Sequence, residues 1–127
     1  MVSTEWQSLM WSTCHQLTLV LYSLSKYDDC LHFTRLALQL EPENSESWYI
    51  YVEIQEKLQN EREGYKSWLN HRTIPDNNSS IIARQIQHKQ SSIRSLEDKK
   101  NDEVHQRERK YLQLDVKALQ YFAQQKR

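Results

Sequence analysis

The sequence predicts an all-α protein. The chain has 127 residues with one glycine and two prolines, which leaves too few turn residues for a sheet protein of this length. Apolar residues recur at helical spacing, and short polar clusters separate the segments in which they do so. Hydrophobic residues make up 38% of the chain and charged residues 27%. This balance allows one domain of modest size with a small core.

Four helices are predicted in the first part of the chain, over residues 8–24, 27–40, 45–58 and 61–72. The second ends in Leu-Glu-Pro-Glu-Asn-Ser, where Pro42 cannot donate a helical hydrogen bond and restricts the residue before it. The polar cluster then turns the chain, and Trp48 stands in the first turn of the next helix.

One long C-terminal helix is predicted from about residue 80, because Ser79 or Ser80 is a good N-cap before an apolar stripe. The stripe contains Ile82, Ile86, Ile93 and Leu96, and it resumes at Tyr111, Leu114, Ala118 and Phe122. Between Glu97 and Lys110, ten of fourteen residues are charged. That stretch is interpreted either as a solvated part of the helix or as a break in it.

The chain also repeats itself with a period of thirty-four residues. At this offset Leu24 aligns with Leu58 and Cys30 with Gly64, while Cys14 aligns with Trp48. The period and register are those of the tetratricopeptide repeat (TPR). Large, small and proline positions of the first unit are matched by Leu17, Leu21, Leu24, Tyr27, Cys30, Ala37 and Pro42. Residues 1–78 are therefore predicted to form two TPR-like hairpins, and residues 79–127 a C-terminal extension helix that either caps the repeats or projects.

Two stretches resemble the C-terminal half of the TPR region of large immunophilin co-chaperones: KYDDCLHFTRLALQLEPENSESWY and HQRERKYLQLDVKALQYFAQQ. The resemblance implies a module for protein–protein interaction, with a heat-shock chaperone or its clients as the expected partner. It includes no isomerase domain, so this chain is either a piece of a longer protein or a shortened relative.

Co-chaperones of this family hold the acidic tail of a chaperone in a clamp of lysine, asparagine and arginine, which donate charge-assisted hydrogen bonds to carboxylates. In this register the clamp positions carry Gln16, Glu46 and Ile50. A glutamate repels a carboxylate and an isoleucine donates nothing, so the resemblance implies the fold without the usual clamp. One alternative is a rearranged clamp that uses Lys57, Arg62 or Lys66.

Two sets of residues are predicted to contact partners. The concave helix faces of the repeat are expected to present Gln16, Glu46, Tyr49, Ile50 and Glu53. Apolar residues at the two ends of the chain are expected at interfaces, namely Trp6, Leu9, Met10, Tyr111, Leu114 and Phe122. The second set favours an alternative function, a structural subunit that forms a homo- or hetero-oligomer.

Other functions are disfavoured. Lys plus Arg equals Asp plus Glu at 17 each, so the chain lacks the positive charge of a general nucleic-acid binder. No phosphate loop, serine elbow or paired carboxylates indicate an enzyme, and no cofactor is expected. Cys14, His15, Cys30 and His32 lack the tight spacing of a zinc site and are interpreted as packing residues.

The expected location is a reducing compartment, the cytoplasm or the nucleus. The N-terminal segment MVSTEWQSLM lacks the basic and apolar regions of a signal peptide. The apolar run LTLVLY is too short to span a bilayer, so no membrane insertion is expected.

Overall fold

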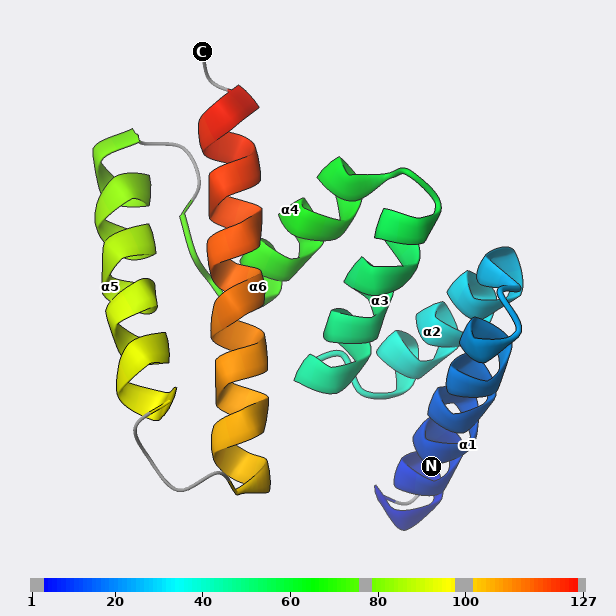
Figure 1. Cartoon of the computed structure of the whole chain (residues 1–127). Helices are drawn as coiled ribbons and strands as arrows, with labels where there is room; N and C mark the ends of the chain where they lie inside the picture. Colours follow the sequence, from blue (N-terminus) through cyan, green and yellow to red (C-terminus); the bar gives the residue numbers. More distant parts are fainter. Residues whose placement is uncertain (1–3, 76–78, 98–101, 126–127) are drawn as a thin grey trace. The chain divides into compact units, whose positions relative to one another are not determined.

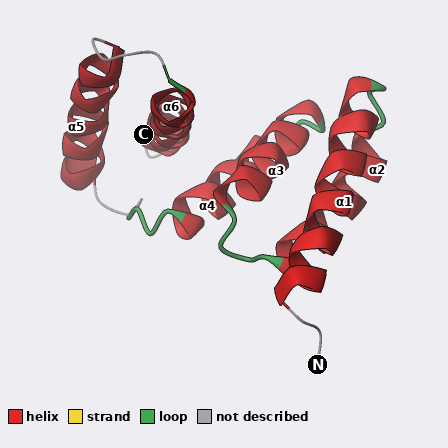
Figure 2. Cartoon of the chain, turned by 90° about the horizontal axis from the view of Figure 1, so that it is seen from below, coloured by secondary structure: helices red, strands yellow, loops and turns green. Residues whose placement is uncertain are grey.

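The computed structural model describes residues 4–75, 79–97 and 102–125, and within these ranges every regular element is an α-helix. Figure 1 shows the helices in chain order, and Figure 2 shows the same helices joined by loops. Their bounds are α1 Thr4–Ser23, α2 Tyr27–Leu40, α3 Ser45–Lys57, α4 Glu61–His71, α5 Ser79–Glu97 and α6 Glu103–Gln125. The predicted all-α class is confirmed. None of the described helices is long and apolar enough to cross a membrane.

The chain forms two compact units, residues 1–67 and residues 68–127, and the division falls within α4. The first unit contains α1, α2, α3 and the first turns of α4, and the second contains the end of α4 with α5 and α6. The predicted domain boundary at 78/79 adjoins residues 76–78, which lie outside the described residues. That boundary stays a prediction.

The two N-terminal hairpins, α1–α2 and α3–α4, turn in the same way. Ser25 and Gln59, thirty-four residues apart, both have a left-handed φ of 59°. In both turns the residue that follows donates its main-chain N–H to a carbonyl of the preceding helix. Lys26 donates to Leu21 at 2.9 Å, and Asn60 donates to Gln55 at 2.8 Å. These are Schellman motifs, which satisfy the free carbonyls at a helix end. The chain makes both turns without using its single glycine.

Within each hairpin the two helices make a close contact at equivalent residues. The Cys30 thiol on α2 donates to the main-chain oxygen of Thr18 on α1 at 3.4 Å, and both side chains are fully buried. In the second hairpin, a Cβ built on Gly64 would lie 3.1 Å from the Gln55 Cβ and 3.5 Å from the Val52 Cα. Small residues at these positions therefore allow the two helices of each hairpin to pack closely.

The connection between α2 and α3 is held by two side chains, those of Asn44 and Trp48. Asn44 caps α3, because its side-chain oxygen accepts from the N–H groups of Glu46 and Ser47 at 3.0 and 3.3 Å. The indole N–H of Trp48 donates to the Pro42 carbonyl at 2.7 Å. The predicted break at Pro42 thus coincides with a turn that is held by polar contacts on both sides.

The C-terminal segment differs from the prediction of one long helix, which is wrong. It forms two antiparallel helices, α5 and α6, that pack along one another (Figure 1). The alternative of a break in the charged stretch is the correct one, since α5 ends at Glu97 and α6 begins at Glu103. Asp102 caps α6, accepting from the His105 N–H at 2.9 Å. This hydrogen bond is the main reason that the pKa of Asp102 is lowered. The predicted alternatives of capping and projecting concern the placement of this segment against residues 1–67 and stay predictions.

Candidate protein-binding face

One face of α3 carries three glutamates and a tyrosine. Glu46, Tyr49, Glu53 and Glu56 recur at steps of three or four residues, so they lie along the same side of the helix. All four side chains are partly exposed. We call this set the acidic α3 face. It contains Glu46, Tyr49 and Glu53, which are three of the five residues predicted for the concave helix faces.

The charges of this face affect the pKa of its tyrosine, Tyr49. Partial burial and then the negative charges of Glu53, Glu46 and Glu56 raise the pKa of Tyr49 to about 12. Tyr22 on α1 lies near the same face, close enough for the charges of Glu53 and Glu56 to act on its hydroxyl. Burial and the charge of Glu53 also raise the pKa of Tyr22. Two tyrosines and three carboxylates thus form a surface of negative potential on α1 and α3.

The structure corrects the placement of Ile50. It was expected on the exposed concave face, but it is buried in an apolar cluster with Cys30 and Ile54. This cluster lies where α3 packs against residues of the first hairpin, such as Leu21 and Leu31. Gln16 lies on α1 and is exposed. Ile50 therefore packs in the core beneath α3 and has little surface with which to contact a partner.

The cations of the rearranged clamp are exposed. Lys57 is the last residue of α3, and Arg62 and Lys66 lie in the first turns of α4. They follow the acidic α3 face in the chain, but the described contacts do not link them to it. The rearranged clamp stays a prediction.

The residues predicted at interfaces divide into two groups. Trp6, Leu9 and Met10 on α1 are exposed, as an interface with another protein requires. Tyr111, Leu114 and Phe122 on α6 are buried within the chain, which corrects their expected role. A side chain that is already buried stabilises its own fold and has little surface left to offer a partner.

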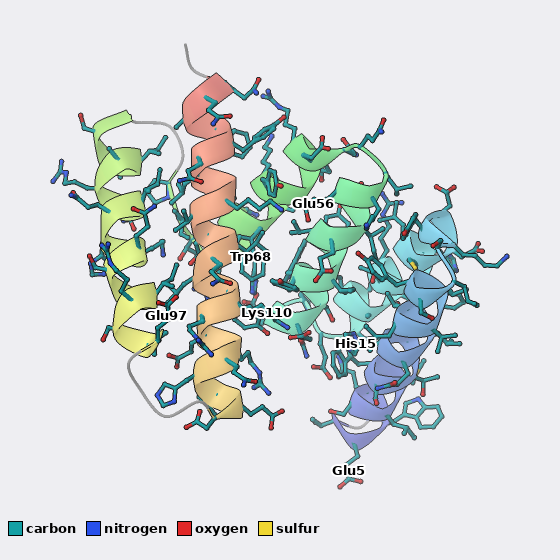
Figure 3. All side chains as sticks on the ribbon, in the orientation of Figure 1. Glu5, His15, Glu56, Trp68, Glu97 and Lys110 are labelled. Atoms are coloured by element: carbon teal, nitrogen blue, oxygen red, sulfur yellow. The ribbon has the colours of Figure 1, made fainter. Side chains whose placement is uncertain are left out.

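A buried carboxylate that the sequence analysis missed lies at the centre of the second unit. Asp115 on α6 is fully buried. Its Oδ1 accepts from the indole N–H of Trp68 at 2.7 Å and from Nε of Arg72 at 3.1 Å. Its Oδ2 accepts from Nη2 of Arg72 at 2.9 Å and from Nζ of Lys89 at 3.1 Å. Trp68 is labelled in Figure 3.

This cluster, which we call the Asp115 centre, joins three helices. Trp68 and Arg72 come from α4 and the turn after it, and Lys89 comes from α5. The Arg72 guanidinium also lies 5.6 Å from the Trp68 ring centre and 6.0 Å from that of Tyr111. Four donated hydrogen bonds satisfy the carboxylate, so the centre is best explained as a determinant of the fold. A signal was present in the sequence, since Asp115 falls on the apolar stripe between Tyr111 and Ala118.

Metal ligation finds no support in the described parts of the chain. No three histidine, cysteine, aspartate or glutamate side chains come together there in a group that could hold a metal ion. Cys14 and Cys30 are both free thiols. His15 instead stacks on Trp11, with ring centres 4.8 Å apart (His15 is labelled in Figure 3).

Comparisons with known proteins add no relative. No protein-family model, no curated protein and no solved structure matches this chain. The functional argument therefore rests on the repeated hairpins and on the chemistry of the acidic α3 face.

Proposed function

We propose that this chain is a protein-binding module of the tetratricopeptide type, an adaptor without the carboxylate clamp of the co-chaperones that it resembles. The observation that carries the proposal is the repetition of one hairpin geometry after thirty-four residues. The left-handed turns at Ser25 and Gln59 and the close approaches at Cys30 and Gly64 occupy the same places in both hairpins. Stacked hairpins of this kind present extended surfaces that bind other proteins.

The charge of the acidic α3 face favours a positively charged partner. Its carboxylates disfavour the negatively charged tail that a chaperone would supply. Burial is the largest cause of the raised pKa of Tyr49, and the negative charges of Glu53, Glu46 and Glu56 that add to it also favour a cation beside the tyrosine. Tyrosine adds a rigid, amphipathic contact surface of the type that is enriched in interfaces. We therefore propose that the partner segment carries lysine or arginine and binds along α3.

Removing two of the negative charges tests this proposal. The unchanged chain and the full chain with Glu46→Gln and Glu53→Gln are each titrated at low salt with a peptide of alternating lysine and alanine. Isothermal titration calorimetry measures the binding. Each lost exposed ion pair costs about 0.2–1 kcal/mol, so the double variant is expected to bind about two- to thirtyfold more weakly.

A matched control removes the same net charge elsewhere. Asp28 and Glu43 are exposed, on the first turn of α2 and in the turn before α3. The variant with Asp28→Asn and Glu43→Gln is expected to bind the peptide as the unchanged chain does. Equal weakening in both double variants would mean that the peptide senses only net charge, and the assignment to α3 would be abandoned.

A further inference from the structure

The outer side of α1 carries a largely apolar stripe that is exposed among the described residues. We call it the α1 stripe: Trp6, Met10, Thr13, Leu17, Val20 and Leu24. All six residues are exposed, with Trp6 at 53% and Leu24 at 59% of their full exposure. They follow one another in alternating steps of four and three residues. This spacing forms a straight seam along a helix, and such a seam packs against another helix.

The chain itself shows how such a seam is covered. Thirty-four residues after the last four members of the α1 stripe stand Ser47, Tyr51, Ile54 and Leu58 on α3. The first three are buried, and Leu58 packs against the apolar cluster of Ile54 and Cys30. The first hairpin supplies the cover: the Trp11 indole N–H donates to the Ser47 hydroxyl at 2.6 Å, and Cys30 and Leu31 pack in that cluster. The equivalent residues are thus covered by the first hairpin on α3 but are exposed on α1.

The charge of α1 limits what can cover the stripe. Between Thr4 and Ser23 the helix has one acidic residue, Glu5, and no lysine or arginine. Apart from Glu5, a charged partner would find no complementary charge on this helix, and it would lose its hydration there. The covering surface must therefore be apolar and helical.

Two copies cannot stack head to tail. In such a stack, the α1 stripe of one copy would be covered by α4 of the next copy, in the way that α2 covers the equivalent residues of α3. The counterpart of Leu31 at this offset is Tyr65, and it is buried, as are Trp68 and Leu69 that follow it. Among the described residues, every exposed large apolar side chain except Val104 lies on α1 or directly after it. In another copy of this chain, the described surface that can match the α1 stripe is therefore the α1 stripe itself.

We propose that the α1 stripe is the contact between two copies of this chain, which pack stripe against stripe about a two-fold axis. An isologous contact of this kind uses the same patch on both subunits and closes as a dimer. This inference goes beyond the proposed peptide-binding function, because it concerns α1 rather than the acidic α3 face. A monomeric chain would leave the peptide titration unaffected, so the two proposals fail separately.

Sedimentation velocity of the full chain at tens of micromolar tests the dimer. The unchanged chain is expected to sediment as a dimer, and Leu17→Glu is expected to weaken its association at least about tenfold, because the glutamate would be desolvated in the seam. Leu19→Glu is the matched control. Leu17 and Leu19 are 42% and 39% exposed on the same helix, but Leu19 lies off the stripe. The Leu19 variant is expected to remain a dimer.

A second variant protects the test against misfolding. Thr13→Arg places a charge in the stripe without removing an apolar side chain, and circular dichroism checks that the helices persist. It is expected to weaken the dimer as Leu17→Glu does. A monomeric unchanged chain would overturn the proposal. So would a dimer that survives both stripe variants, or one that Leu19→Glu dissociates equally.

Discussion

The thiol of Cys30 on α2 lies 3.4 Å from the main-chain oxygen of Thr18 on α1. Thirty-four residues later, Gly64 stands against Val52 in the second hairpin. A large side chain at either place would force the helices apart. These two equivalent contacts support the repeat that we propose for helices α1 to α4.

The first prediction concerns Gly64. Gly64→Leu is expected to destabilise the chain by about 1–3 kcal/mol, because the new side chain would overlap Gln55 and the main chain of Val52. Urea unfolding followed by circular dichroism measures the change. Lys66→Leu, at an exposed position of the same helix, is the control and should change the free energy of unfolding by less than about 0.5 kcal/mol. Equal effects of the two substitutions would refute the close approach at Gly64.

A second prediction concerns the Asp115 centre. Asp115→Ala is expected to cost about 3–5 kcal/mol, because it leaves the cations of Arg72 and Lys89 without their buried counter-charge. Guanidinium unfolding of the full chain measures the loss. Gln113→Ala, on the exposed side of α6, should cost less than about 0.5 kcal/mol. A small effect of Asp115→Ala would show that the carboxylate is not the determinant of the fold inferred for it.

The left-handed turns give a prediction of the opposite sign. Ser25→Gly and Gln59→Gly are each expected to stabilise the chain by about 0.5–1 kcal/mol, because glycine adopts a positive φ without steric cost. Thermal unfolding compares them with Ser23→Gly, a substitution in the last turn of α1 that should destabilise by about 0.5–1 kcal/mol. Destabilisation by both turn substitutions would contradict the backbone conformation at these residues.

A fourth prediction concerns the ionisation of Tyr49. Its pKa is about 12 in the folded chain against 10.0 ordinarily. The folded state therefore holds this proton more tightly than the unfolded state, and the stability that it contributes is complete below pH 10 and is lost as the pH rises toward 12. Titration of tyrosinate absorbance should show a late-titrating group that Tyr49→Phe removes. Glu53→Gln should lower the pKa of Tyr49, and an unchanged pKa would exclude the negative potential assigned to this face.

The sequence was a good guide to the helices because their ends depend on local chemistry. Pro42 and the capping Asn44 separate α2 from α3, and the predicted and observed bounds there agree within one residue. The small residues Cys30 and Gly64 also indicated where helices meet. Ile50 was misplaced because clamp register, not burial, assigned it to the surface. Its inward position on α3 was visible in the apolar spacing with Ile54.

The second unit was harder to predict because its determinants are distant in the chain. Arg72 and Asp115 are forty-three residues apart, and no local pattern pairs them. An aspartate on an apolar stripe indicates that a cation is needed, but it does not say which one. The break before α6 depends on Asp102, and the sequence does not distinguish it from Asp98 or Asn101 as the N-cap.

We propose that the acidic α3 face lacks the clamp for acidic tails and prefers a cationic partner. The most direct measurement compares three peptides of equal length against the full chain at low salt: an acidic peptide with a free C-terminal carboxylate, the same peptide amidated, and a lysine-containing peptide. We predict binding of the lysine peptide and no difference between the two acidic ones. Micromolar binding of the free acid, abolished by amidation, would contradict the account.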